Sequence, residues 1–123
     1  MDLLLKIYPQ ERKMPMLYLT VEDFYEKAAA CAGLTRQEEL ECAKRMKEGD
    51  GDARRQLMES YLPMVAGHIR RARPEQQTLG MVLYCLRALE SALDSFDFFQ
   101  EGETFAHRLS WHLRQASVAY TVR

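Results

Sequence analysis

The C-terminal segment carries the side chains best suited to contact a nucleic acid. Between Thr104 and Arg123 there are three arginines, two histidines and no acidic residue, and Phe105 and Trp111 add aromatic rings. Cationic side chains bind phosphates, and aromatic side chains stack on unpaired bases. The segment therefore indicates a nucleic-acid surface. An ordinary solvated helix face has the same composition, so both interpretations stay open at this point.

Other chemistries have less support in the sequence. His107 and His112 are five positions apart, which is the wrong helical spacing for two ligands of one metal ion, so we predict no metal site. There is no glycine-rich phosphate loop, no nucleophile signature and no suitably spaced carboxylate pair, so we predict no enzyme activity and no cofactor. We expect His68 to be a packed histidine and Cys85 a small core residue.

Length and composition indicate one globular domain. The chain has 123 residues, of which 47% are hydrophobic and 28% charged, and a net charge of −1 excludes a general polycation. The small net charge hides an uneven distribution of charge along the chain. An arginine-rich stretch over 54–73 and an acidic stretch over 75–103 precede the C-terminal segment, which has no acidic residue. We find no run of 18 apolar residues, no secretory leader and no cysteine framework, and we expect a cytoplasmic protein without a membrane partner.

The hydrophobic periodicity predicts an all-α protein. Apolar residues recur every three or four positions, and we find no convincing strand. One helix is expected from a Thr20 cap to Gly33, and a second from a Thr35–Glu38 capping box to the glycines at 49 and 51. We assign 1–19 to an irregular N-terminal extension and 20–123 to a single helical domain.

Three further helices follow in the prediction. The third covers 53–72 and contains Pro63, where we expect a bend rather than a break. The fourth, over 79–96, has a wide apolar stripe that predicts a central position. The last helix follows an acidic linker over 97–103 and has one apolar face, made of Phe105, Leu109, Leu113, Ala116 and Tyr120.

Four stretches together resemble region 1.2 and region 2 of bacterial sigma factors of the sigma-70 family. Leu34-Thr-Arg-Gln-Glu-Glu-Leu40, with Gly49-Asp50, looks like region 1.2, and Ala53 to Val65 looks like region 2.1. Ala88 to Asp97 is similar to the end of region 2.2, and 102–116 to regions 2.3 and 2.4. The resemblance implies a compact helical bundle like sigma region 2, here with an extra N-terminal helix.

The resemblance also implies a role. Sigma region 2 docks on core RNA polymerase and captures the −10 promoter element as a melted single strand. Trp111 stands at the position of the family's wedge tryptophan, and Phe105 at another aromatic position of that site. Gln115 matches a glutamine that reads the upstream edge of the element, with Arg114 before it.

Other positions of the same site depart from the family. His107 replaces a threonine, Arg108 a tyrosine and His112 a tryptophan, although a guanidinium and an imidazole can both pack on bases. Glu103 replaces an aromatic residue and would repel phosphate. The implied DNA-binding residues are Phe105, His107, Arg108, Trp111, His112, Arg114 and Gln115.

The region that corresponds to the polymerase-binding surface has become apolar. Where the family is polar, this chain has Gly80-Met-Val-Leu83-Tyr84-Cys85-Leu86. Such a face is either buried under another element, such as the N-terminal extension, or rebuilt for a partner or a dimer. The predicted polymerase- or partner-binding residues are Leu83, Tyr84, Leu86 and Arg87.

Two functions follow as expectations. The first is a sigma-factor-like transcription initiation protein that binds promoter −10 or single-stranded DNA, with core RNA polymerase as a further partner. The second is a non-catalytic regulatory module that keeps the sigma fold and binds polymerase, a sigma factor or itself. The family's later domains are absent from these 123 residues, so we expect a homodimer or a partner subunit that supplies them.

Overall fold

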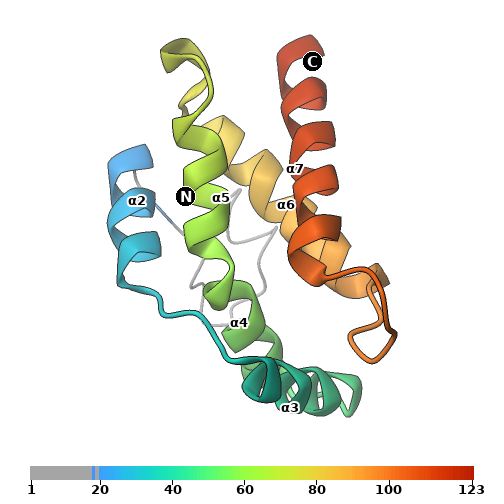
Figure 1. Cartoon of the computed structure of the whole chain (residues 1–123). Helices are drawn as coiled ribbons and strands as arrows, with labels where there is room; N and C mark the ends of the chain where they lie inside the picture. Colours follow the sequence, from blue (N-terminus) through green and yellow to red (C-terminus); the bar gives the residue numbers. More distant parts are fainter. Residues whose placement is uncertain (1–17, 19) are drawn as a thin grey trace.

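The structure, a computed structural model, describes Tyr18 and residues 20–123, and this part of the chain is all-helical (Figure 1). The helices are α2 (Val21–Ala30), α3 (Arg36–Lys47), α4 (Gly51–Ser60), α5 (Leu62–Arg70), the short 3-10 helix η2 (Pro74–Gln76), α6 (Leu79–Ser95) and α7 (Phe105–Val122). The predicted all-α bundle is confirmed, and α2 is the first of its described helices. The predicted irregular extension lies outside the described residues, apart from Tyr18.

Threonine caps start most of the long helices. The hydroxyl of Thr20 accepts a hydrogen bond from the backbone N–H of Asp23 at 3.0 Å. Thr35 and Glu38 form the predicted capping box, in which each side chain accepts from the other residue's backbone N–H. The hydroxyls of Thr78 and Thr104 accept from the backbone N–H groups of Met81 and His107 and so cap α6 and α7. These caps satisfy N–H groups that the first turn of a helix leaves without a partner.

Two predicted helix limits are wrong. The first helix ends at Ala30 and not at Gly33, because Cys31 is extended (φ −84°, ψ 135°) and the chain leaves the helix there. The predicted third helix breaks instead of bending, since α4 ends at Ser60 and α5 begins at Leu62. Pro63 has no N–H to continue the α-helical ladder, and Tyr61 N–H bonds only three residues back, to Met58, at 3.1 Å.

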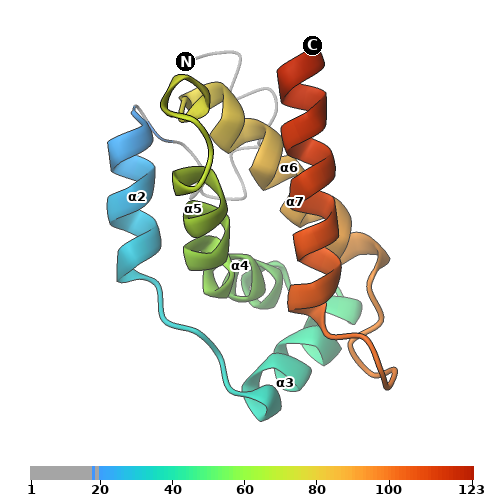
Figure 2. The same cartoon turned by 45° about the horizontal axis from the view of Figure 1, so that its top comes forward.

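The helices pack in pairs around one core. The contact between α6 and α7 is the most extensive, while α2 packs on α5 and α3 on α4. Figures 1 and 2 both place α3 at the end of the molecule where α7 begins, far from the C-terminus. The predicted apolar stripe of α6 is confirmed as central, because these of its residues are fully buried: Met81, Val82, Cys85, Leu86 and Leu89.

The linker between α6 and α7 supplies part of the core. Phe98 lies in the acidic segment that separates the two helices, yet its side chain is buried. Its ring stacks on Phe105, with 5.2 Å between centroids, and meets Phe96 edge-on at 5.0 Å. Tyr61 completes this aromatic cluster through an edge contact with Phe105 at 4.7 Å. The cluster ties the start of α7 to the junction of α4 and α5.

Candidate nucleic-acid interface

Helix α7 has one face in the core and one in solvent. The five residues predicted for its apolar face are buried: Phe105, Leu109, Leu113, Ala116 and Tyr120. On the opposite side, Trp111, Gln115, Val118 and Val122 follow one another at spacings of four, three and four residues, which places them on one side of a helix. We call these four residues the outer face of α7.

Large apolar side chains are exposed on this outer face. Trp111 is 51% exposed, Val118 59% and Val122 73%. His107 and Arg114 are also exposed and flank the face near Trp111. A tryptophan this accessible leaves part of its ring free to stack on a planar ligand. Trp111, His107, Arg114 and Gln115 are therefore sequence-predicted residues that the structure brings together at the surface.

Phe105 does not belong to this surface. Its side chain is only 1% exposed and is enclosed by the aromatic cluster. A base cannot stack on this ring in the structure, so the prediction of Phe105 as an accessible stacking residue is wrong. The physical reason is that Phe96 and Phe98, which flank the start of the linker, bury the first turn of α7.

Arg108 is held by an acidic neighbour. Its Nε and Nη2 donate to the two carboxylate oxygens of Glu103, at 3.2 and 2.8 Å. The guanidinium of Arg108 keeps the pKa of the Glu103 carboxyl below its ordinary value, so this carboxylate is ionised at neutral pH. Arg108 also lies 5.8 Å from the ring centre of Phe96. The bidentate pair fixes the plane of the guanidinium.

A hollow of about 390 Å³ lies beside this ion pair on the surface of α7. It is lined by Glu103, His107, Arg108, Trp111 and His112. The ring of His112 meets that of Trp111 edge-on, with 5.2 Å between centroids. Burial, and then the positive charge of Arg108, lower the pKa of His112 below its ordinary value, so this imidazole is neutral at pH 7. The hollow thus combines an aromatic wall, a neutral imidazole and a neutralised ion pair.

A basic patch lies where α5 meets α7. The Nε2 atom of His68 and the hydroxyl of Ser117 are hydrogen-bonded at 2.7 Å, which joins the two helices. Burial first, and then the charges of Arg71 and Arg114, lower the pKa of His68 below its ordinary value. We define the basic patch as His68, Arg71 and Arg114. It unites an arginine of the stretch over 54–73 with one of the acid-free end, and Arg114 also flanks Trp111 in sequence.

The lowered pKa of His68 has a consequence for stability. Because the unfolded chain binds a proton at His68 more readily than the folded protein does, stability should fall as the pH drops below about 6.5. In urea unfolding between pH 7.5 and 5, His68→Gln should lose less stability than the wild type. His112 shifts in the same direction, so part of the pH dependence should remain. An unchanged pH dependence in His68→Gln would contradict this assignment.

The predicted partner-binding residues of α6 are not one exposed surface. Leu86 has no exposed area and belongs to the core, so its prediction as a partner contact is wrong. Leu83 and Tyr84 are half-buried, and the ring of Tyr84 meets Tyr120 of α7 edge-on at 5.3 Å. Arg87 alone among the four is exposed. Most of the apolar run therefore belongs to the core, including Met81, Val82, Cys85 and Leu86.

His68 and Cys85 are both packed inside the protein, as the sequence predicts. His68 is half-buried and hydrogen-bonded, as described above. Cys85 has no exposed area, and burial raises the pKa of its thiol to about 12. Within the residues that the structure describes, no group of three or more His, Cys, Asp or Glu side chains could hold a metal ion. None of the described helices is long and apolar enough to cross a membrane.

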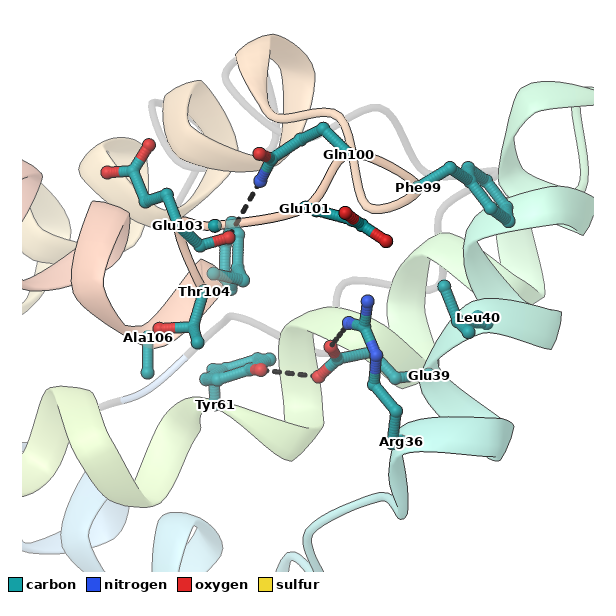
Figure 3. Close-up of a pocket in the computed structure, with 12 residues that line it drawn as sticks. Arg36, Glu39, Leu40, Tyr61, Phe99, Gln100, Glu101, Glu103, Thr104 and Ala106 are labelled. Carbon is teal, nitrogen blue, oxygen red and sulfur yellow. Dashed lines mark hydrogen bonds and ion pairs between the residues drawn. The ribbon is translucent and has the colours of Figure 1, made fainter.

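A larger hollow of about 660 Å³ lies between α3 and the linker before α7 (Figure 3). Its polar side chains bond mainly within the protein. The hydroxyl of Tyr61 donates to the carboxylate of Glu39, which also pairs with Arg36 at 3.4 Å. Gln100 donates to the backbone carbonyl of Glu103 at 2.7 Å. The bond between Tyr61 and Glu39 attaches α3 to the junction of α4 and α5.

Sequence reasoning missed two features of the interface. It placed Glu103 as a repulsive neighbour of phosphate but did not pair it with Arg108, although their spacing of five residues across a helix start permits the contact. It noted the arginine-rich stretch over 54–73 but could not predict that Arg71 and Arg114 both act on His68. No family model matches the chain, and no curated protein is significantly similar to it.

Proposed function

We propose that this protein is a sigma-factor-like transcription protein that binds single-stranded or promoter −10 DNA. The proposed contact surface joins Trp111 and Gln115 of the outer face of α7, the hollow beside Trp111 and the basic patch. Core RNA polymerase is the proposed protein partner. The single observation that carries the proposal is the exposed ring of Trp111 on a helix without any acidic residue.

The physics of single-strand binding supports the proposal. Proteins that bind unpaired strands combine aromatic stacking surfaces with cationic groups along the backbone path. Trp111 provides the stacking surface, and Arg114 provides a cation with no acidic partner among the described residues. Arg71 adds a second charge to the same region, because both arginines act on His68. Gln115, exposed beside Trp111 and Arg114, adds a hydrogen-bonding side chain.

The test is binding of a labelled −10-type non-template oligonucleotide, measured by fluorescence anisotropy. Trp111→Ala should weaken binding about tenfold, because stacking of one base on an aromatic side chain contributes on the order of 1–3 kcal/mol. Trp111→Phe, which keeps a ring, should retain much of the affinity. Val118→Ala changes another exposed side chain of the same face and is the matched control, with affinity expected to stay near that of the wild type.

Binding should also weaken steeply as salt is added, since phosphate contacts release counterions. Arg114→Ala should reduce that salt dependence, whereas Trp111→Ala should leave it nearly unchanged. If Trp111→Ala and the wild type bind the oligonucleotide equally well, or if neither binds, the proposed function is wrong.

A second candidate function is a regulatory protein–protein module that binds polymerase, a sigma factor or a second copy. The observation that favours it is the exposure of Val118 and Val122, which extend the apolar outer face beyond Trp111. Light scattering with and without core polymerase separates the two functions. Assembly that Val118→Ser abolishes, without any binding to oligonucleotides, would support the second candidate.

A further inference from the structure

The ion pair beside Trp111 leaves part of the Arg108 guanidinium free. A guanidinium has five N–H donors, and Glu103 accepts from one at Nε and one at Nη2. The three remaining N–H groups, on Nη1 and Nη2, have no hydrogen-bond acceptor among the residues that the structure describes. Arg108 lines the hollow of about 390 Å³, so a ligand there can reach these donors. The free edge is the end-on fork, formed by two neighbouring N–H groups.

The charge of the pair decides what this fork can bind. The carboxylate of Glu103 cancels the charge of Arg108 and lies in the lining of the same hollow. A phosphate in the hollow would meet this carboxylate, and repulsion would oppose its binding. The carboxylate does not repel an uncharged acceptor. Such an acceptor can still receive two hydrogen bonds from the guanidinium, whose plane is fixed. The hollow therefore favours a neutral ligand with two adjacent acceptors over an anion.

The position of Trp111 narrows the ligand further. Arg108 and Trp111 are three residues apart on α7, so their side chains are neighbours on the helix surface, and both line the hollow. A base that stacks on Trp111 would present an edge toward Arg108. Among the four bases, guanine is the one whose major-groove edge offers two adjacent acceptors, N7 and O6, whereas adenine pairs an acceptor with a donor there.

We propose that the hollow binds a guanine of a single strand, stacked on Trp111, with N7 and O6 accepting hydrogen bonds from the Arg108 fork that Glu103 holds in place. Glu103 is then a positioning residue that also keeps phosphate out, and Arg108 is the residue that selects the base. This inference rests on the proposed function, since it assigns a base preference to the same single-strand surface.

The experiment compares short oligothymidylates that carry one central guanine, adenine, 7-deazaguanine or no substitution. Trp111 is the single tryptophan of the chain, so its fluorescence reports binding at the hollow itself. The guanine strand should bind about tenfold more tightly than the thymidylate strand. The 7-deazaguanine strand, which lacks only the N7 acceptor, should lose most of that gain, and the adenine strand should resemble thymidylate.

Two variants separate positioning from charge. Arg108→Lys keeps the positive charge but loses the fork, so the preference for guanine over thymidine should fall to near one. Glu103→Gln removes the carboxylate, so guanine preference should fall while binding of plain oligothymidylate strengthens, because Arg108 becomes available to phosphate. Circular dichroism checks that both variants keep their helices, and Arg87→Lys, on exposed α6 surface, is the matched control.

The outcomes distinguish this inference from the proposed function. Equal, Trp111-dependent binding of all four strands would overturn the guanine site and leave single-strand binding standing. A guanine preference that persists in Arg108→Lys, or that 7-deazaguanine does not reduce, would also overturn it. If no strand binds at all, both the guanine site and the proposed function are wrong.

Discussion

Replacement of Phe105 by alanine should destabilise the protein by about 3–5 kcal/mol, because a buried phenylalanine lost from a packed core leaves a cavity. The side chain is 1% exposed and contacts the rings of Tyr61, Phe96 and Phe98. Since domains of this size are stable by about 5–15 kcal/mol, the variant should lose a large share of its stability. The measurement is urea denaturation followed by far-ultraviolet circular dichroism.

Trp111→Ala is the matched control for this prediction. It removes an aromatic side chain from the same helix, but from the half-exposed outer face, so stability should change by only about 0.5 kcal/mol. Phe105→Ala should thus mainly lower stability, whereas Trp111→Ala should mainly weaken oligonucleotide binding. A Phe105→Ala variant as stable as the wild type, with weaker oligonucleotide binding, would show that Phe105 contacts the ligand after all.

The second large effect is expected in α6. Leu86→Ala should destabilise the protein by about 2–5 kcal/mol, because Leu86 is fully buried in the most central helix. Arg87→Ala changes the next residue, whose side chain is exposed, and should alter stability by about 0.5 kcal/mol or less. Thermal unfolding of the two neighbouring variants measures the difference directly.

The same pair of variants tests the apolar run as a partner surface. If Leu86 contacted a partner instead of the core, Leu86→Ala would keep the melting temperature of the isolated protein and weaken complex formation. Because Leu86 lies in the core, we expect Leu86→Ala to lower the melting temperature of the isolated protein instead. Arg87, as the exposed member of the predicted partner set, is the variant to use in pull-down experiments with core RNA polymerase.

Local sequence signals predicted much of the fold. The capping box at Thr35 and Glu38 is a short-range hydrogen-bonding pattern, and the structure forms it as expected. All five residues predicted for the buried face of α7 are buried. This prediction succeeded because helical periodicity can be seen within a single segment, without knowledge of the rest of the fold. The sequence correctly predicted an irregularity in the helix near Pro63. It became a break and not a bend because the backbone of Tyr61 adopts a non-helical conformation.

Long-range packing decided the features that the sequence could not predict. The burial of Phe105 depends on Phe98, a linker residue that composition assigned to an acidic loop. The basic patch depends on the His68–Ser117 bond, which joins residues 49 positions apart. Trp111 lies outside the buried face that periodicity defines, and its ring is exposed, whereas the ring of Phe105 is enclosed.

Cys85 gives the protein a chemical reporter of its own opening. Its thiol is buried, and burial raises its pKa so far above neutrality that almost none of it is the reactive thiolate. An alkylating reagent therefore modifies Cys85 only when the packing around α6 opens and returns the thiol to water. The labelling rate of Cys85 thus records the opening of the core, whereas Cys31, at the C-terminal end of α2, is already partly exposed in the folded protein.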